Sequence, residues 1–114
     1  EAFVQQIQTD LGVPVIKAFS IANQDDVTRA LESRADYILL DQGKGGTGKA
    51  FDWSLLKGIG RPYFLAGGLT PQNAAQAAAL QPYALDVSSG IETDGVKDRE
   101  KMTLFMTTLG VYRR

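Results

Sequence analysis

Residues 65–69, LAGGL, and residues 86–90, DVSSG, are the most informative stretches of this chain, because each ends a short apolar run in small residues. Such short apolar runs are typical of buried strands. Where neighbouring parallel strands end in this way, free backbone N–H groups lie side by side and bind phosphate. The pair of stretches therefore predicts a parallel sheet with a phosphate site at one edge.

Outside these stretches, apolar spacing predicts alternating helices and strands. The expected strands share β-branched or continuous apolar sequence and cover residues 13–21, 37–41, 62–66 and 84–87. The expected helices share apolar residues at helical spacing and cover residues 2–11, 24–33, 52–57, 71–80 and 99 to about 109. Their predicted boundaries are a stop at Gly12 and caps at Asn23, Asp52, Thr70 and Asp98. Both glycine-containing loops are thus expected to lead into helices.

Alternation of strands and helices is typical of a parallel α/β sheet with right-handed crossovers. The sequence predicts a leading helix and four such units, which is half of a (β/α)8 TIM barrel of about 250 residues. We therefore expect a partial barrel, with an open, doubly wound sheet as the alternative. No low-complexity linker divides residues 1–114, which favours a single domain.

Composition excludes several kinds of protein. The 114 residues are 44% hydrophobic and carry a net charge of −1, which gives no electrostatic basis for binding nucleic acid or an anionic membrane. The absence of cysteine and histidine removes disulfides, the usual zinc ligands and the usual proton shuttle. No apolar stretch is long enough to cross a bilayer, so we expect a cytoplasmic location. The first residue is Glu1 rather than methionine, which favours a fragment or a trimmed chain.

The predicted phosphate site uses both loops. Gly67 and Gly68 lack a Cβ, so an anion can approach their backbone. Ser88 and Ser89 add hydroxyl donors, and Gly90 completes the second loop. The alternative is that the two glycines form only a tight turn between a strand and a helix. Two such loops on neighbouring strands favour phosphate binding.

Two carboxylates are candidates for chemistry. Asp41 ends the apolar run YILLD, and ligands of α/β folds bind at the carboxyl ends of strands. Loss of water there favours the protonated form of a carboxyl group, so Asp41 is predicted to be a general acid. Asp86 occupies the equivalent position on the next strand but one and is expected to face the same cavity. The alternative for both residues is a hydrogen-bonding role within the loops.

Residues 43–50, GKGGTGKA, match the spacing of a nucleotide-binding P-loop except at Ala50, where serine or threonine would bind magnesium. The missing hydroxyl argues against a nucleoside triphosphate. We interpret this glycine-rich segment as a lid over a substrate, with a solvated turn as the alternative.

Five stretches occur in an order and spacing that resemble the phosphoribosylanthranilate isomerase family. They are YILLD at 37–41, GGTGKAFDW at 45–53, LAGGLTPQN at 65–73, LDVSSGIE at 85–92 and GVKD at 95–98. VIKA at 15–18 also fits the fifth strand of that family. The resemblance covers strands five to eight of the family's barrel. It implies an Amadori rearrangement of phosphoribosylanthranilate in tryptophan biosynthesis, without a cofactor or a metal.

The resemblance also implies roles for particular residues. Asp41 corresponds to the family's general acid for ribose ring opening, and Asp86 to the aspartate that contacts the anthranilate end of the substrate. Gly46 and Thr47 fall in the family's mobile substrate loop. The residues that correspond to the family's phosphate-binding loops are Gly67, Gly68, Ser88, Ser89 and Gly90.

The family's general base is a cysteine on its first strand, and an arginine for the anthranilate carboxylate also lies in its first half. This chain matches neither region and has no cysteine, so we expect it to be inactive alone. Its expected partners are a second copy, forming a homodimer of half-barrels, or a chain carrying an N-terminal half. The expected ligand is the substrate, free phosphate or sulfate. Two alternatives remain: a non-catalytic phosphate-binding module and a different sugar-phosphate barrel related to indole-glycerol-phosphate synthase.

Overall fold

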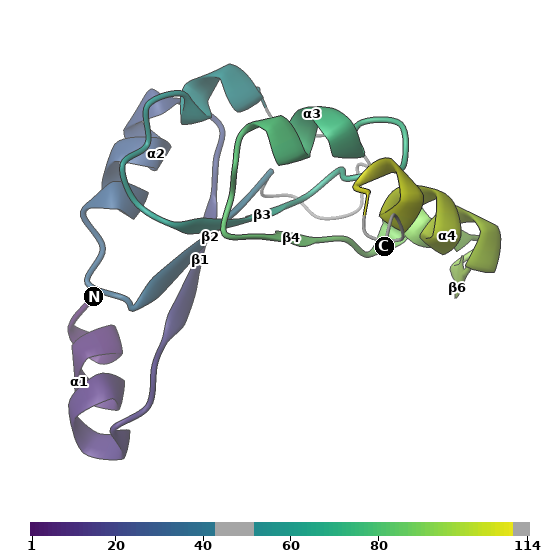
Figure 1. The fold of residues 1–114 in the computed structure, drawn as a ribbon. Coiled ribbons are helices and arrows are strands. Elements are labelled where there is room, and N and C mark those ends of the chain that lie inside the picture. The colour runs from purple at the N-terminus through teal and green to yellow at the C-terminus, as the bar shows by residue number, and fades with distance from the viewer. Residues whose placement is uncertain (43–51, 111–114) are drawn as a thin grey trace.

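A four-stranded parallel sheet organises the computed structural model, which describes residues 1–42 and 52–110. Its strands are β1 (Ile16–Ser20), β2 (Tyr37–Asp41), β3 (Tyr63–Ala66) and β4 (Ala84–Asp86). They lie side by side in chain order, as Figure 1 shows. An open, doubly wound sheet would instead reverse its strand order at a switch point. The observed order supports the α/β prediction and argues against the doubly wound alternative.

Helices precede, connect and follow the strands of this sheet. The α-helices are α1 (Ala2–Leu11), α2 (Gln24–Leu31), α3 (Ala74–Ala79) and α4 (Arg99–Thr108), and the 3-10 helices are η1 (Trp53–Leu56) and η2 (Ser89–Ile91). A small antiparallel hairpin of β5 (Glu92–Thr93) and β6 (Val96–Lys97) precedes α4. None of the helices in the described residues is long and apolar enough to cross a membrane.

The two faces of the sheet differ in burial. Figure 1 shows α2 and α3 on the same side of the sheet. Side chains on that side, including Ile38, Leu40 and Leu65, are fully buried and form the core with residues of the helices. Burial on this scale contributes about 2 kcal/mol for each large aliphatic side chain. The core therefore holds the helices against one face of the sheet.

The opposite face of the sheet, called the open face below, is apolar and partly exposed. Strand register places Ile16 beside Tyr37, and Leu39 beside Phe64. The rings of Tyr37, Phe64 and Tyr83 cluster there, with centroids 5.5–5.9 Å apart. Ile16 is 52% exposed and Tyr83 is 63% exposed. An aromatic and aliphatic surface of this kind is typical of a face that another surface covers.

Local capping explains where several helices begin. Asn23 and Asp26 form a reciprocal capping box at the start of α2. The side chains of Asp52 and Asp98 accept hydrogen bonds from backbone N–H groups at the starts of η1 and α4. Gly12 ends α1 in the left-handed conformation, with φ of 63°. The predictions of these four boundaries are confirmed.

Other predicted boundaries were wrong. The first strand is shorter than residues 13–21, and α2 ends at Leu31 rather than at residue 33. The third α-helix begins at Ala74 rather than at residue 71, because residues 71–73 form a turn. That turn is fixed by Asn73, whose Oδ1 accepts from the Thr70 N–H at 2.8 Å and whose Nδ2 donates to the Gly68 carbonyl at 2.8 Å. Such local side-chain bonds compete with helical backbone bonds.

Candidate functional site

A pocket of about 260 Å³ lies at the carboxyl ends of β2, β3 and β4. Its lining brings together most of the residues that sequence reasoning selected and adds three that it missed. The predicted residues are Asp41, Gly67, Gly68, Asp86, Ser88, Ser89 and Gly90; the missed ones are Gln42, Ala66 and Leu69. This is the end of a parallel sheet at which α/β proteins bind ligands.

Asp41 and Asp86 stand on either side of Ala66 in this pocket. Strand register pairs Ala66 with Asp86, and it pairs the residues preceding Asp41 with those preceding Ala66. Two strand spacings separate the backbones of the two aspartates, which is about 10 Å. Asp41 is half-buried, whereas Asp86 is exposed. The two carboxylates therefore face one cavity with room for a ligand between them.

Gly67 brings the loop after β3 close to Asp41. A Cβ on Gly67 would collide with Oδ1 of Asp41 and lie 2.8 Å from the backbone N of Gln42. Gly67 also has φ of 88°, in the left-handed region that other residues rarely adopt. The glycine therefore allows the Asp41 carboxylate to lie against the backbone of the neighbouring loop.

Gly90 brings the loop after β4 against the same region. A Cβ on Gly90 would strike the Leu69 carbonyl oxygen, and it would lie 2.7 Å from the carbonyl carbon of that residue. The two loops are thus in backbone contact, and Gly90 is a packing residue as well as a lining residue. Ser88 and Ser89, which precede it, are exposed. Backbone groups from both loops consequently form one continuous rim.

The surroundings of the second loop differ from the prediction that both loops lead into helices. Residues Ser89–Ile91 form the short 3-10 helix η2, and the β5–β6 hairpin separates it from α4. Sequence reasoning missed this hairpin although its turn, Asp94-Gly95, is a common hairpin signal. The donors available to an anion here belong to the loop itself rather than to the start of a long helix.

The predictions for Gly46, Thr47 and the glycine-rich segment concern positions 43–51, which lie outside the described residues. Their proposed role stays a prediction. Within residues 1–42 and 52–110, no three acidic, histidine or cysteine side chains are grouped as a metal site would require.

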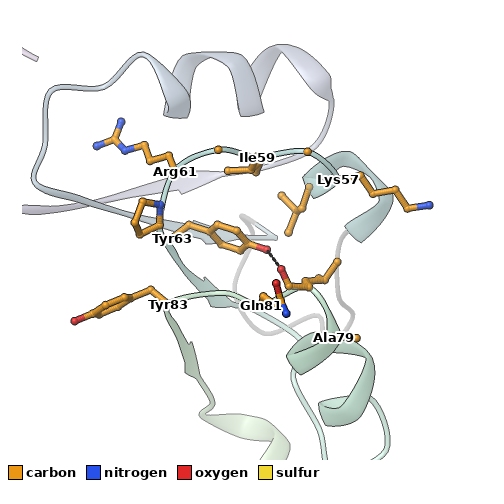
Figure 2. A pocket seen from close by; sticks show the side chains of 12 residues that line it. Lys57, Ile59, Arg61, Tyr63, Ala79, Gln81 and Tyr83 are labelled. Carbon is orange, nitrogen blue, oxygen red and sulfur yellow. Dashed lines mark hydrogen bonds between the residues drawn. The ribbon is translucent and has the colours of Figure 1, made fainter.

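A larger pocket, of about 830 Å³, lies at the opposite ends of β3 and β4, as Figure 2 shows. Lys57, Arg61, Tyr63, Gln81 and Tyr83 are among the residues that line it. The Arg61 guanidinium there already donates to four backbone carbonyl oxygens at distances of 2.6–3.3 Å. Because this pocket lies away from both aspartates, the smaller one is the candidate site.

Comparison with known proteins gives a consistent family. A family model described as N-(5'phosphoribosyl)anthranilate (PRA) isomerase matches residues 1–108. The N-(5'-phosphoribosyl)anthranilate isomerase of Streptococcus mutans is 42% identical over 108 residues, which cover 92% of this chain and 54% of that protein.

Solved structures agree. A structure of monomers of the dimeric isomerase from Thermotoga maritima has a TM-score of 0.77 at 36% identity and covers 94% of this chain. A structure of the isomerase with reduced 1-(o-carboxyphenylamino)-1-deoxyribulose 5-phosphate has a TM-score of 0.76 at 34% identity and covers 97% of this chain. These matches take in 54% and 56% of the two structures, so the chain spans about half the length of the relatives that it matches.

Proposed function

Because the chain belongs to the N-(5'-phosphoribosyl)anthranilate isomerase family, we propose that it carries the acid and the phosphate site of that isomerase. The substrate would be N-(5'-phosphoribosyl)anthranilate, and the reaction an Amadori rearrangement in tryptophan biosynthesis. The observation that carries the proposal is the pocket that unites Asp41, Asp86 and both small-residue loops at one end of the sheet.

Asp41 is proposed as the general acid. In the reaction, a proton from its carboxyl group goes to the ribose ring oxygen as the ring C–O bond breaks, and this leaves an open-chain protonated imine with the positive charge on the nitrogen. A base then removes the proton from the neighbouring carbon, and the resulting enolamine becomes the aminoketose. The place of Asp41 at the carboxyl end of β2, in one pocket with Asp86 and both small-residue loops, supports this role.

The phosphate is proposed to lie against the rim formed by the two loops. Backbone groups of Gly67, Gly68 and Gly90, together with Ser88 and Ser89, line this part of the pocket. Phosphate oxygens accept hydrogen bonds from such backbone and hydroxyl donors. With the phosphate there, the other end of the substrate extends toward Asp86, which we propose contacts the anthranilate moiety. The substrate would thus be held at both ends.

The four strands are proposed to be one half of a barrel wall. Their sequential order, and an open face that carries Tyr37, Phe64 and exposed Tyr83, support this arrangement. A barrel leaves neither open edges nor an uncovered inner face. A chain with the family's N-terminal half, or a second copy, would cover this face. The sequence has no cysteine, and we propose that the N-terminal half supplies the base.

The test is isomerisation of phosphoribosylanthranilate by the purified chain, alone and mixed with the separately produced N-terminal half of a family member. We expect turnover only in the mixture. Failure of a mixture that forms a stable complex would overturn the catalytic proposal. Retained phosphate binding in that case would favour the alternative, a non-catalytic phosphate-binding module, because the pocket exists without the second half.

A further inference from the structure

The β5–β6 hairpin lies between the proposed phosphate loop and α4, and the proposed function assigns it no role. Its two strands pair Glu92 with Lys97 and Thr93 with Val96. The turn between them contains Asp94 and Gly95, with φ of 54° and 80°. Hairpins of this length do not persist alone in water, so external contacts must hold this one in place.

Lys97 connects the hairpin to the serine loop. Its Nζ donates to the Ser88 carbonyl oxygen at 3.2 Å and to Oε2 of Glu92 at 2.6 Å. The Ser88 carbonyl also accepts from the N–H of Ile91 at 3.3 Å, which closes the turn of η2. One carbonyl oxygen at the start of the loop is therefore held from two directions.

The other side of the hairpin is anchored to α4. Lys101 donates from Nζ to the Glu92 carbonyl at 2.7 Å. Thr93 donates from its hydroxyl to Asp98 at 2.6 Å, and the Asp98 N–H donates to the Ile91 carbonyl at 2.7 Å. Asp98 is itself the cap of α4. The hairpin is thus fixed to the start of α4, and Lys97 bonds the hairpin in turn to the serine loop.

Peptide geometry gives this contact a consequence in the pocket. The carbonyl of Ser88 and the N–H of Ser89 belong to one planar trans peptide unit and point in opposite directions. Holding the carbonyl oxygen on the hairpin side therefore fixes the N–H direction of Ser89, a residue that lines the pocket. We propose that Lys97 is a positioning residue for the phosphate site and orients the backbone donors of the Ser88–Gly90 loop through the Ser88 carbonyl.

This inference rests on the proposed phosphate site, but it predicts an effect on the loop even without phosphate. The Lys97 side chain is 50% exposed, and exposed ion pairs contribute little to global stability. Loss of the Lys97 side chain should consequently change the conformation of the Ser88–Gly90 loop while leaving the free energy of unfolding nearly unchanged. Phosphate affinity should fall about tenfold, as expected when one well-placed donor is lost.

The experiment compares wild type, Lys97→Met and Lys97→Arg by amide NMR, first without ligand and then in a titration with inorganic phosphate. Without ligand, Lys97→Met should shift the amide signals of Ser89 and Gly90, and Lys97→Arg should restore them, because arginine can also donate to the Ser88 carbonyl. With phosphate, affinity should fall in the first variant and recover in the second. Lys57→Met is the matched control, because it removes a lysine from the opposite pocket.

Added salt distinguishes a positioning role of Lys97 from a purely electrostatic attraction of phosphate. If Lys97 acted only as a nearby positive charge, added sodium chloride would bring wild type and Lys97→Met to equal affinity. We expect the difference to persist. Unchanged loop signals in a folded Lys97→Met protein, or affinities that converge in salt, would overturn the inference. Absence of any phosphate response in wild type would instead overturn the proposed phosphate site, and the ligand-free spectra would still decide the role of Lys97.

Discussion

The Asp41 carboxylate occupies the space that a side chain on Gly67 would need. The contact joins the end of β2 to the loop after β3, and it exists because Gly67 has neither a Cβ nor the restriction to negative φ that a Cβ brings. The position of the proposed acid is thus coupled to the conformation of a proposed phosphate loop. A substitution at either residue that changes its shape should therefore alter the conformation at the other.

Gly67→Ala should therefore displace Asp41. The variant combines a strained backbone, at φ of 88°, with a collision at Oδ1 of Asp41, and we expect it to lower the free energy of unfolding by about 3 kcal/mol. Urea denaturation measures this loss. Gly58→Ala is the matched control, because Gly58 has φ of 79° and nothing within 4 Å of an added Cβ. Equal losses of stability in both variants would show that the positive φ alone, without the collision with Asp41, accounts for the effect at Gly67.

Gly90→Ala should separate the two loops of the pocket. Its Cβ would strike the Leu69 carbonyl, which is backbone and cannot rotate away, so about 2–3 kcal/mol of stability should be lost. Phosphate titration of the folded variant should also show weaker binding. Gly60→Ala serves as the control, since nothing lies within 4 Å of its added Cβ and its φ is not positive. Unchanged phosphate affinity in Gly90→Ala would show that the contact between Gly90 and Leu69 does not contribute to phosphate binding.

Asp41→Asn should remove turnover from the reconstituted isomerase while phosphate affinity holds. Asparagine keeps the shape of the side chain but cannot act as the proposed general acid, so kcat should fall about 10²- to 10⁴-fold. Asp86→Asn should mainly raise KM, because this residue is proposed to contact the substrate. Steady-state kinetics on both variants measure the contrast. A parallel loss of phosphate binding in Asp41→Asn would indicate a role in holding the loop instead.

The parts of the fold that sequence reasoning predicted well are governed by local patterns. β2 occurs at residues 37–41 as expected, because the run YILLD is apolar and bounded by polar residues. The candidate site followed from a general property, the alignment of carboxyl ends in a parallel sheet. The structure brings Asp41 and Asp86 to one pocket at that edge, and their roles stay predictions.

The parts that it missed depend on competing or long-range contacts. Asn73 bonds the turn before α3, so the helix starts later than Pro71 suggests. The hairpin has strands of only two residues, too short to show alternation. The approach of Gly90 to Leu69 is a contact between two loops, and no periodicity in the sequence encodes it.

Arg61→Met should destabilise the protein through the end of α2. The guanidinium donates to the carbonyls of Ala30 and Leu31 at the end of α2 and to those of Ser33 and Ala35 in the segment that leads to β2. Its loss should cost about 2–3 kcal/mol in urea denaturation. Arg61→Lys should recover only part of this, because one ammonium group cannot span the four oxygens. Arg99→Met is the control, because Arg99 lies on the exposed surface of α4. An equal loss of stability in that variant would show that the bonds of Arg61 to the four carbonyls do not stabilise the protein.

Acid should weaken the attachment of α1 through Glu1. The Lys17 ammonium, the Arg34 N–H and the Ser33 hydroxyl donate to the Glu1 carboxylate at 2.7–2.9 Å. With Lys17 the largest cause, these bonds lower the pKa of Glu1 from 4.5 to about 2. A carboxyl group with a lowered folded pKa stabilises the protein fully above its unfolded pKa. That contribution disappears as pH falls from about 4.5 to 2.

The measurement is the difference in Tm between wild type and Glu1→Gln as a function of pH. The difference should be constant above pH 4.5 and should shrink steadily below it, because glutamine cannot gain a proton. Other carboxyl groups, such as Asp36 and Asp98, titrate in both proteins and cancel in the difference. A difference that stays constant down to pH 2 would mean that the bonds to Glu1 do not persist in solution.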